Sequence, residues 1–169
     1  MRCAQCGGEM TVRDETRRSY AGLEDVIVEG VQVRHCASCG EEEVSYKNIE
    51  KLHQEIALRL AEKKAGLTPR EVRFLRTYLG LASSDLARRM GVAKETVSRW
   101  ERADKPLSMG PTAERLLRLM VMRDQPVTEY PLEQLDSVAT EHPAAPLRVR
   151  LKPRRQGWRA EPLPRRRAI

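Results

Sequence analysis

Aromatic side chains and long apolar runs are both scarce in this 169-residue chain, and their scarcity limits what it can be. Aromatic residues make up 4% of the sequence, with a single Phe, so no large aromatic core can form. No apolar run approaches the roughly 18 residues that a membrane-spanning helix needs. The opening residues, MRCAQCGGEM, lack the apolar centre of a signal peptide. We therefore expect a cytoplasmic protein of small folded modules, in which cysteines stay reduced.

Basic charge is in excess, and it is unevenly distributed along the chain. The formal net charge is +7 and the isoelectric point is about 9.5, which favours an anionic partner such as nucleic acid. Residues 1–66 hold 10 basic and 12 acidic side chains, residues 67–124 hold 12 and 7, and residues 125–169 hold 9 and 5. The positive charge thus lies after the segment that contains the cysteines.

Four cysteines in two matching pairs predict a metal site. Each pair has two residues between the sulfurs and a glycine directly after, as CAQCG over residues 3–7 and CASCG over residues 36–40. This spacing lets both thiolates of a pair reach one ion at about 2.3 Å. Four thiolates in a tetrahedron are the structural zinc arrangement, which leaves no open position for catalysis. We expect structural Zn²⁺ to be held by Cys3, Cys6, Cys36 and Cys39.

Other uses of these cysteines are also compatible with the sequence. They can form two disulfides or stay free, and iron can replace zinc in the same ligand set. A redox function is disfavoured, because neither pair opens a helix after a strand. His35 lies beside a cysteine, but four thiolates already complete the site, so an exposed strand histidine is the better interpretation.

The segment between the cysteine pairs predicts β-structure, and the segment after them predicts a helix. Residues 26–33 are rich in β-branched side chains and are interrupted by Gly30, which predicts strands joined by a turn. We expect a zinc ribbon with a β-hairpin over residues 1–45. A connecting helix over residues 46–66 follows from apolar residues at helical spacing, namely Ile49, Leu52, Ile56 and Leu60.

Residues 67–124 predict an all-helical domain. Thr68 and Glu71 form a capping-box pattern with proline at the first helical position. Periodicity then predicts four helices, over residues 69–79, 85–90, 94–102 and 113–122. We expect Ser83 or Ser84 to cap the second helix and Gly91 to form a left-handed turn before the third.

The second and third of these helices predict DNA binding. Val92, Val97 and Trp100 are spaced to be buried, which turns the polar residues of the third helix outward, where they can enter the major groove of DNA. We expect DNA contacts from Ser83, Ser84, Arg88, Lys94, Glu95, Ser98, Arg99 and Arg102.

Individual roles can be assigned within that set. Arg99 suits bidentate binding to guanine, and Lys94 and Ser98 suit bases or phosphates. Glu95 can accept a hydrogen bond from cytosine or repel phosphates, and the remaining residues suit phosphates. One such module buries too little surface for tight specific binding, so we expect a homodimer on a palindromic operator. The helix over residues 113–122 is the candidate dimer contact, with a role in the core as the alternative.

Residues 125–169 differ in composition from the rest. Seven of the ten prolines and nine cations lie here, without a sustained apolar period. We expect this Pro/Arg-rich tail to be disordered. Such a tail can clamp DNA non-specifically, keep the protein in solution or, alternatively, bind RNA.

Residues 67–122 resemble the lambda-repressor/Cro-type helix-turn-helix. The resemblance rests on a Leu-Ala pair, a Gly-Val turn and the run Val-Ser-Arg-Trp-Glu at residues 97–101. The chain departs from this pattern at Ala93, where relatives have a Ser or Thr cap, and at residues 82–84, where a Gln is common.

Taken together, residues 1–122 resemble the MqsA-type antitoxins, in which a YgiT-type zinc finger precedes a helix-turn-helix. This resemblance implies an α+β protein with structural zinc, an N-terminal region that binds and neutralises a ribonuclease toxin, and a C-terminal domain that dimerises and represses the operon. Arg99 falls where the family reads a base, and Glu95 falls where a family member has Asn.

Two other functions compete with this interpretation. A stand-alone transcriptional regulator would contain the same modules without a toxin partner, and only the neighbouring gene separates the two. An enzyme is disfavoured, because no histidine–carboxylate cluster accompanies the cysteines and a saturated metal cannot activate water.

Overall fold

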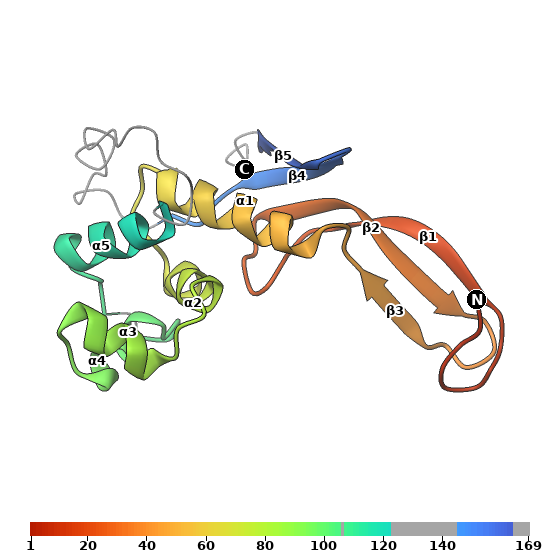
Figure 1. Cartoon of the computed structure of the whole chain (residues 1–169), viewed down its shortest axis with the longest axis horizontal. Coiled ribbons are helices and arrows are strands. Elements are labelled where there is room, and N and C mark those ends of the chain that lie inside the picture. Colours follow the sequence, from red (N-terminus) through yellow and green to blue (C-terminus); the bar gives the residue numbers. More distant parts are fainter. Residues whose placement is uncertain (106, 123–144, 164–169) are drawn as a thin grey trace, which may run out of the picture. The chain divides into compact units, whose positions relative to one another are not determined.

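The computed structural model describes residues 1–105, 107–122 and 145–163, and it confirms the expected mixed α+β class (Figure 1). The chain folds into two compact units. The sheet unit comprises Met1–Tyr20, Glu24–Leu52 and Arg148–Ile169, and the helical unit comprises Ala21–Leu23 and His53–Leu147. None of the described helices is both long and apolar enough to cross a membrane.

The sheet unit is organised around its longest strand, β2. The strands are β1 (Met10–Arg17), β2 (Val26–Cys36), β3 (Glu42–Ser45), β4 (Val149–Arg154) and β5 (Gly157–Pro162). Their order is β1-β2-β4-β5, and β3 also pairs with β2. Strands β1 and β3 pair with β2 antiparallel, whereas β4 pairs with it in parallel. The buried valines of β2 form the centre of this unit: Val26, Val28, Val31 and Val33.

The expected turn at Gly30 is wrong, because β2 continues through it. The pairing with β1 shifts register here: Glu15 faces Val31, but Arg17 faces Val28, which leaves one extra residue on β2. Gly30 has a φ of +70°, a conformation that a glycine adopts without strain in a β-bulge. The glycine therefore marks a bulge inside one long strand.

The expected disorder of residues 125–169 is wrong for the part that forms β4 and β5. These strands are a hairpin, and β4 pairs with β2 from Val26↔Val149 to Val28↔Leu151. Val149 and Leu151 are buried at 4% and 0% exposure, so alternate apolar residues anchor a segment that is otherwise basic. The rest of the expected tail, residues 125–144 and 164–169, lies outside the described residues.

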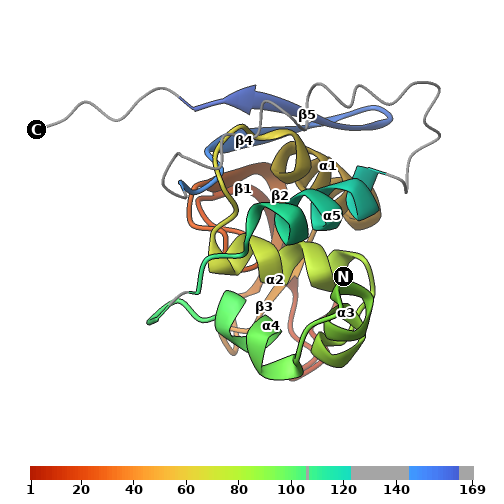
Figure 2. The same cartoon turned by 90° about the vertical axis from the view of Figure 1, so that its left-hand side faces the viewer.

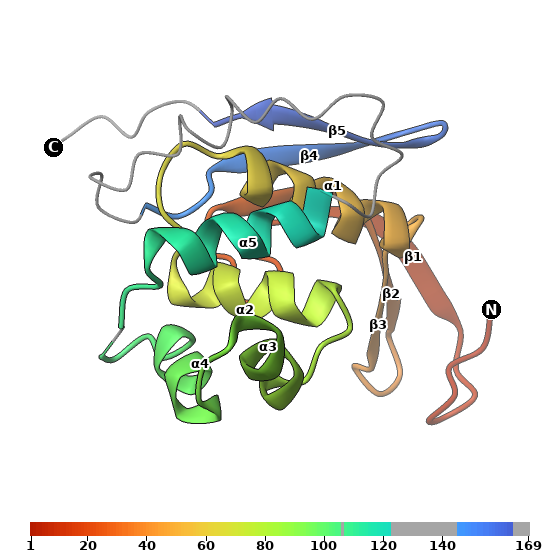
Figure 3. The same cartoon turned by 60° about the vertical axis from the view of Figure 1, so that its left-hand side comes forward.

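The helical unit is built from four whole helices and most of a fifth. Helix α1 (Ile49–Glu62) begins in the sheet unit, and α2 (Pro69–Tyr78), α3 (Ser83–Met90), α4 (Lys94–Trp100) and α5 (Pro111–Met122) follow. Within the helical unit, α2 lies between α5 and the α3–α4 pair (Figures 2 and 3). The expected capping box at α2 is confirmed, because the Thr68 side chain accepts from the Glu71 amide and Glu71 accepts from the Thr68 amide.

The apolar face expected for α1 is mostly confirmed. Leu52, Ile56 and Leu60 are fully buried, whereas Ile49, the first residue of the helix, is 45% exposed. The helix runs from Ile49 to Glu62, a few residues shorter at each end than the expected range 46–66.

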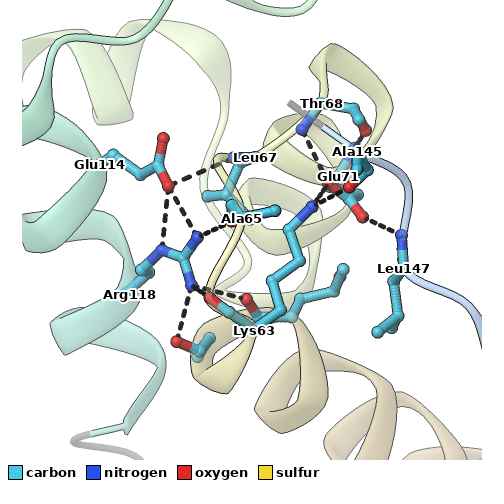
Figure 4. Close-up of polar contacts among 11 residues, drawn as sticks. Lys63, Ala65, Leu67, Thr68, Glu71, Glu114, Arg118, Ala145 and Leu147 are labelled. Atoms are coloured by element: carbon cyan, nitrogen blue, oxygen red, sulfur yellow. Dashed lines mark hydrogen bonds and ion pairs between the residues drawn. The ribbon is translucent and has the colours of Figure 1, made fainter. Parts of the chain in front are cut away.

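A buried arginine holds the α1–α2 connection against α5 (Figure 4). Arg118 of α5 has 0% exposure, and its guanidinium bonds Glu114 Oε1 at 2.7 Å. Glu114 also accepts from the amide of Leu67 at 3.2 Å. The same guanidinium donates to four backbone carbonyls of the connection, those of Leu60, Ala61, Lys63 and Ala65. These carbonyls include the end of α1, whose last C=O groups have no partner inside the helix.

The capping residue Glu71 has a second structural role. It is 1% exposed, and its carboxylate accepts from Lys63 Nζ at 2.5 Å and from the Leu147 amide at 2.7 Å. Lys63 Nζ donates in turn to the Ala145 carbonyl at 2.6 Å. Burial lowers the pKa of Lys63, and the adjacent carboxylate opposes that change. Glu71 therefore ties the start of α2 to residues 145–147, as Figure 4 shows.

Candidate metal centre and nucleic-acid interface

The four cysteines converge on one point of the sheet unit. Their Sγ atoms all lie within 4.8 Å of one another, with 3.7 Å between Cys3 and Cys39 and 3.5 Å between Cys6 and Cys36. A tetrahedral ion bound at about 2.3 Å would separate its sulfurs by about 3.8 Å, which is close to these distances. Disulfide sulfurs lie at about 2.05 Å, so all four thiols are unpaired. The donor set thus fits a tetrahedral metal ion with thiolate ligands.

The two loops that carry the cysteines have the same local structure. The amide of Gly7 donates to the Cys3 carbonyl and the amide of Gly40 donates to the Cys36 carbonyl, both at 2.9 Å. Both glycines have positive φ, +72° and +78°, which a side chain would strain. The sequence pattern CxxCG therefore encodes one turn used twice, and each turn brings its two sulfurs to the same side.

Local hydrogen bonds favour the thiolate form of the most buried ligand. The backbone N–H of Cys39 lowers the pKa of Cys36 to about 6, and the N–H of Ser38 acts in the same direction. A thiolate is the form that binds a metal ion. Gly8 allows the two turns to approach, because a Cβ there would lie 2.7 Å from Ser38 Oγ. This close approach was not recognised from the sequence, although the Gly-Gly pair after Cys6 was a signal for it.

Helices α3 and α4 are joined by a short turn at the predicted position. Gly91 ends α3 in the left-handed conformation, with φ of +66°, and the Val92 amide donates to the Ala87 carbonyl at 3.0 Å. Val97 and Trp100 are buried as expected, at 0% and 5% exposure, whereas Val92 is only half-buried. One side of α4 is therefore fixed against the helical unit and the opposite side is free.

The residues expected to contact DNA lie mostly on exposed surface. Ser83 is half-buried, and the other seven are exposed: Ser84, Arg88, Lys94, Glu95, Ser98, Arg99 and Arg102. The four of these residues that belong to α4 lie opposite its buried side: Lys94, Glu95, Ser98 and Arg99. Arg102 falls beyond α4, which ends at Trp100, and it pairs with Asp104 at 2.7 Å. This ion pair lowers the pKa of Asp104.

The expected serine cap of α3 is wrong. Ala82 is the N-cap, and its amide donates to the side chain of Asp85 at 3.2 Å, so the helix already includes Ser83 and Ser84. Asp85 in the first turn therefore replaces a serine cap and also pairs with Arg88 at 2.6 Å. At α4 the N-cap is Ala93, without a side-chain hydrogen bond, so the first amides of this exposed helix lack a side-chain cap.

An ion pair that the sequence did not reveal fixes the end of α4. Arg76 of α2 binds Glu101, the C-cap of α4, through Nε at 2.5 Å and Nη2 at 3.0 Å. The same guanidinium donates to the Leu81 carbonyl at 2.7 Å. Both side chains are nearly buried, at 13% and 11% exposure, and the pair raises the pKa of Arg76. No local pattern links two residues so far apart in the sequence.

The match to a known protein family spans both of these regions. A family model described as the antitoxin component of a bacterial toxin–antitoxin system, MqsA, matches residues 1–126. This chain belongs to the MqsA antitoxin family. No curated protein matches it. The family match includes the four cysteines and the α3–α4 pair of this antitoxin, and it ends before β4 and β5.

Part of the apolar surface of helix α5 of the antitoxin is buried in the core. Leu117 and Val121 are buried at 0% and 1% exposure, in keeping with the core role considered for this helix. Leu116 is 39% exposed and Met120 is half-buried, so some apolar surface is left outward.

Proposed function

We propose that this antitoxin is a sequence-specific DNA-binding repressor. In this proposal α3 and α4 form a helix-turn-helix, and α4 enters the major groove. The observation that carries the proposal is the two-sided character of α4, whose Val97 and Trp100 are buried while Lys94, Ser98 and Arg99 are exposed. A helix fixed on one side and polar on the other can place its N-terminal residues at base edges.

The charges of α4 and its neighbours suit this role. Among the residues that the structure describes, Arg99 makes only a long hydrogen bond to the Glu95 carbonyl, at 3.4 Å, so its guanidinium can turn to bind a guanine. Lys94 and Ser98 would contact bases or phosphates. Glu95 would repel the phosphate backbone or accept a hydrogen bond from cytosine. Ser83, Ser84, Arg88 and Arg102 would fix the register on the phosphates, for which Arg88 and Arg102 must exchange their present carboxylate partners.

A structural metal ion, a second copy of the chain and a toxin complete the proposed function. Zn²⁺ would be held by the four cysteines as a structural ion, because a closed set of four thiolates leaves no position for substrate. A homodimer would bind a palindromic operator, since one module buries too little surface alone. The N-terminal region, with its excess of acidic side chains, would neutralise a basic ribonuclease toxin.

Sequence-specific DNA binding can be tested by letting the purified protein select duplexes from a pool of random sequences. We expect one palindromic sequence to be enriched. Arg99→Ala should weaken the free energy of DNA binding by about 1–3 kcal/mol and relax specificity at one base pair of each half-site. Arg115→Ala, an exposed position on α5, is the matched control and should leave selection unchanged. A uniform loss across sequences would make Arg99 a phosphate contact, and no enrichment by the native protein would refute the proposal.

A further inference from the structure

The β4–β5 hairpin has one buried and one cationic side. Residues 148–162 contain six cations and a single carboxylate, Glu161. Val149 and Leu151 are buried, so the alternating positions of β4 lie on its opposite, more exposed side. Two of the outward cations already have partners, because Arg150 pairs with Glu29 and Lys152 pairs with Glu161. Arg154, the last residue of β4, and Arg155 lie at the turn between the two strands.

A groove of about 660 Å³ lies at that turn, within the sheet unit. Three cations line it, Lys47, Arg154 and Arg155, against one carboxylate, Asp14. All three cations are exposed, and within residues 1–105, 107–122 and 145–163 none of them forms an ion pair. The remaining polar lining is neutral and can donate hydrogen bonds: Gln32 and Ser45. The groove therefore has the charge and the donors that suit an anion.

The groove is held in shape from both sides. Trp158 of β5 donates from Nε1 to the Lys47 carbonyl at 3.1 Å, which fixes the segment after β3 beside the hairpin. Gly30 of the β2 bulge lets the hairpin approach closely, because a Cβ there would lie 2.8 Å from Pro153 Cγ. The three cations thus extend from backbone that is already positioned, which lowers the entropic cost of binding.

We propose that this groove binds the phosphodiester backbone of duplex DNA without reading its sequence. Arg159 adds an exposed cation on the neighbouring strand, so positive charge continues beyond the groove as a polyanion requires. Cations that contact phosphates give affinity without sequence information, and they release counterions on binding. The hairpin lies beyond the part of the chain that the family match covers, and this contact is separate from any made by α4.

The salt dependence of binding to a random-sequence duplex tests the groove in the full-length protein. The slope of log K against log salt is negative, and each lost phosphate contact reduces its magnitude by about 0.9. The combined variant Lys47→Ala, Arg154→Ala and Arg155→Ala should therefore reduce the magnitude by about 2.7. The control removes the same charge from three other exposed cations, by changing Arg2, Arg18 and Lys64 to alanine. We expect the control to keep the slope of the native protein.

Either of two results with the alanine variants would overturn the proposal: an unchanged slope in the groove variant, or an equal fall in the control, which would reflect net charge alone. The conservative variant Arg154→Lys with Arg155→Lys guards against misfolding, and it should keep the native slope because charge is retained. A fall there equal to that of the alanine variant would also count against a phosphate contact. Because the duplex carries no operator, the outcome does not depend on whether α4 reads sequence.

Discussion

Replacement of Arg118 by alanine should strongly destabilise the helical unit. The guanidinium is fully buried and bonds Glu114 and four backbone carbonyls, so its removal leaves a buried carboxylate and the end of α1 without their main donor. Breaking a buried ion pair by removing one partner costs about 3–5 kcal/mol. Domains of this size are stable by about 5–15 kcal/mol, so a large part of the stability would be lost.

Thermal unfolding followed by far-UV circular dichroism measures this loss, because most helical residues lie in the helical unit. At about 4–8 °C per kcal/mol, the midpoint should fall by about 12–40 °C. Arg115→Ala, on the exposed side of the same helix, should change stability by less than about 0.5 kcal/mol. The double variant Arg118→Met with Glu114→Leu should recover much of the loss, because no unpaired charge stays buried. An Arg118→Ala protein as stable as the control would refute the reasoning.

Two further predictions concern the sheet unit. Chelation of the metal should unfold the cysteine turns while α2–α5 keep their circular dichroism signal, because the ligands hold only the sheet unit together; equal folding with and without metal would contradict this. Gly30→Ala should destabilise the sheet unit more than Gly7→Ala in urea denaturation. Both glycines have positive φ, but only Gly30 has a neighbour, Pro153, within reach of a new Cβ. Equal losses would show that the approach of the hairpin is not tight.

Features encoded by neighbouring residues could be predicted from the sequence. The capping box of Thr68 and Glu71, the turn at Gly91 and the shared turn of each CxxCG pair follow from spacing over a few residues. The boundaries were less certain, since Ala82 rather than Ser83 caps α3. There the aspartate in the first turn satisfies the backbone amide, and no pattern distinguished it from a serine cap.

Features that depend on distant partners could not be predicted. The β4–β5 hairpin has only Val149 and Leu151 as alternating buried residues, and its arginines and prolines are typical of disorder. Its partner is β2, near the other end of the sequence, and a parallel pairing over a few residues leaves no local signal. The same holds for Arg118 and for Glu71, whose charges sequence patterns would place on the surface.

We propose above that the outward side chains of α4 read operator DNA. A nuclear magnetic resonance titration of the full-length protein with its selected duplex tests this claim most directly, since each amide of Lys94–Trp100 reports separately. We expect the largest chemical-shift changes to fall on α4 and the start of α3, and Arg99→Ala to weaken binding of this duplex by about 5- to 150-fold. Tight binding to the selected duplex with the amides of α4 unchanged would contradict it.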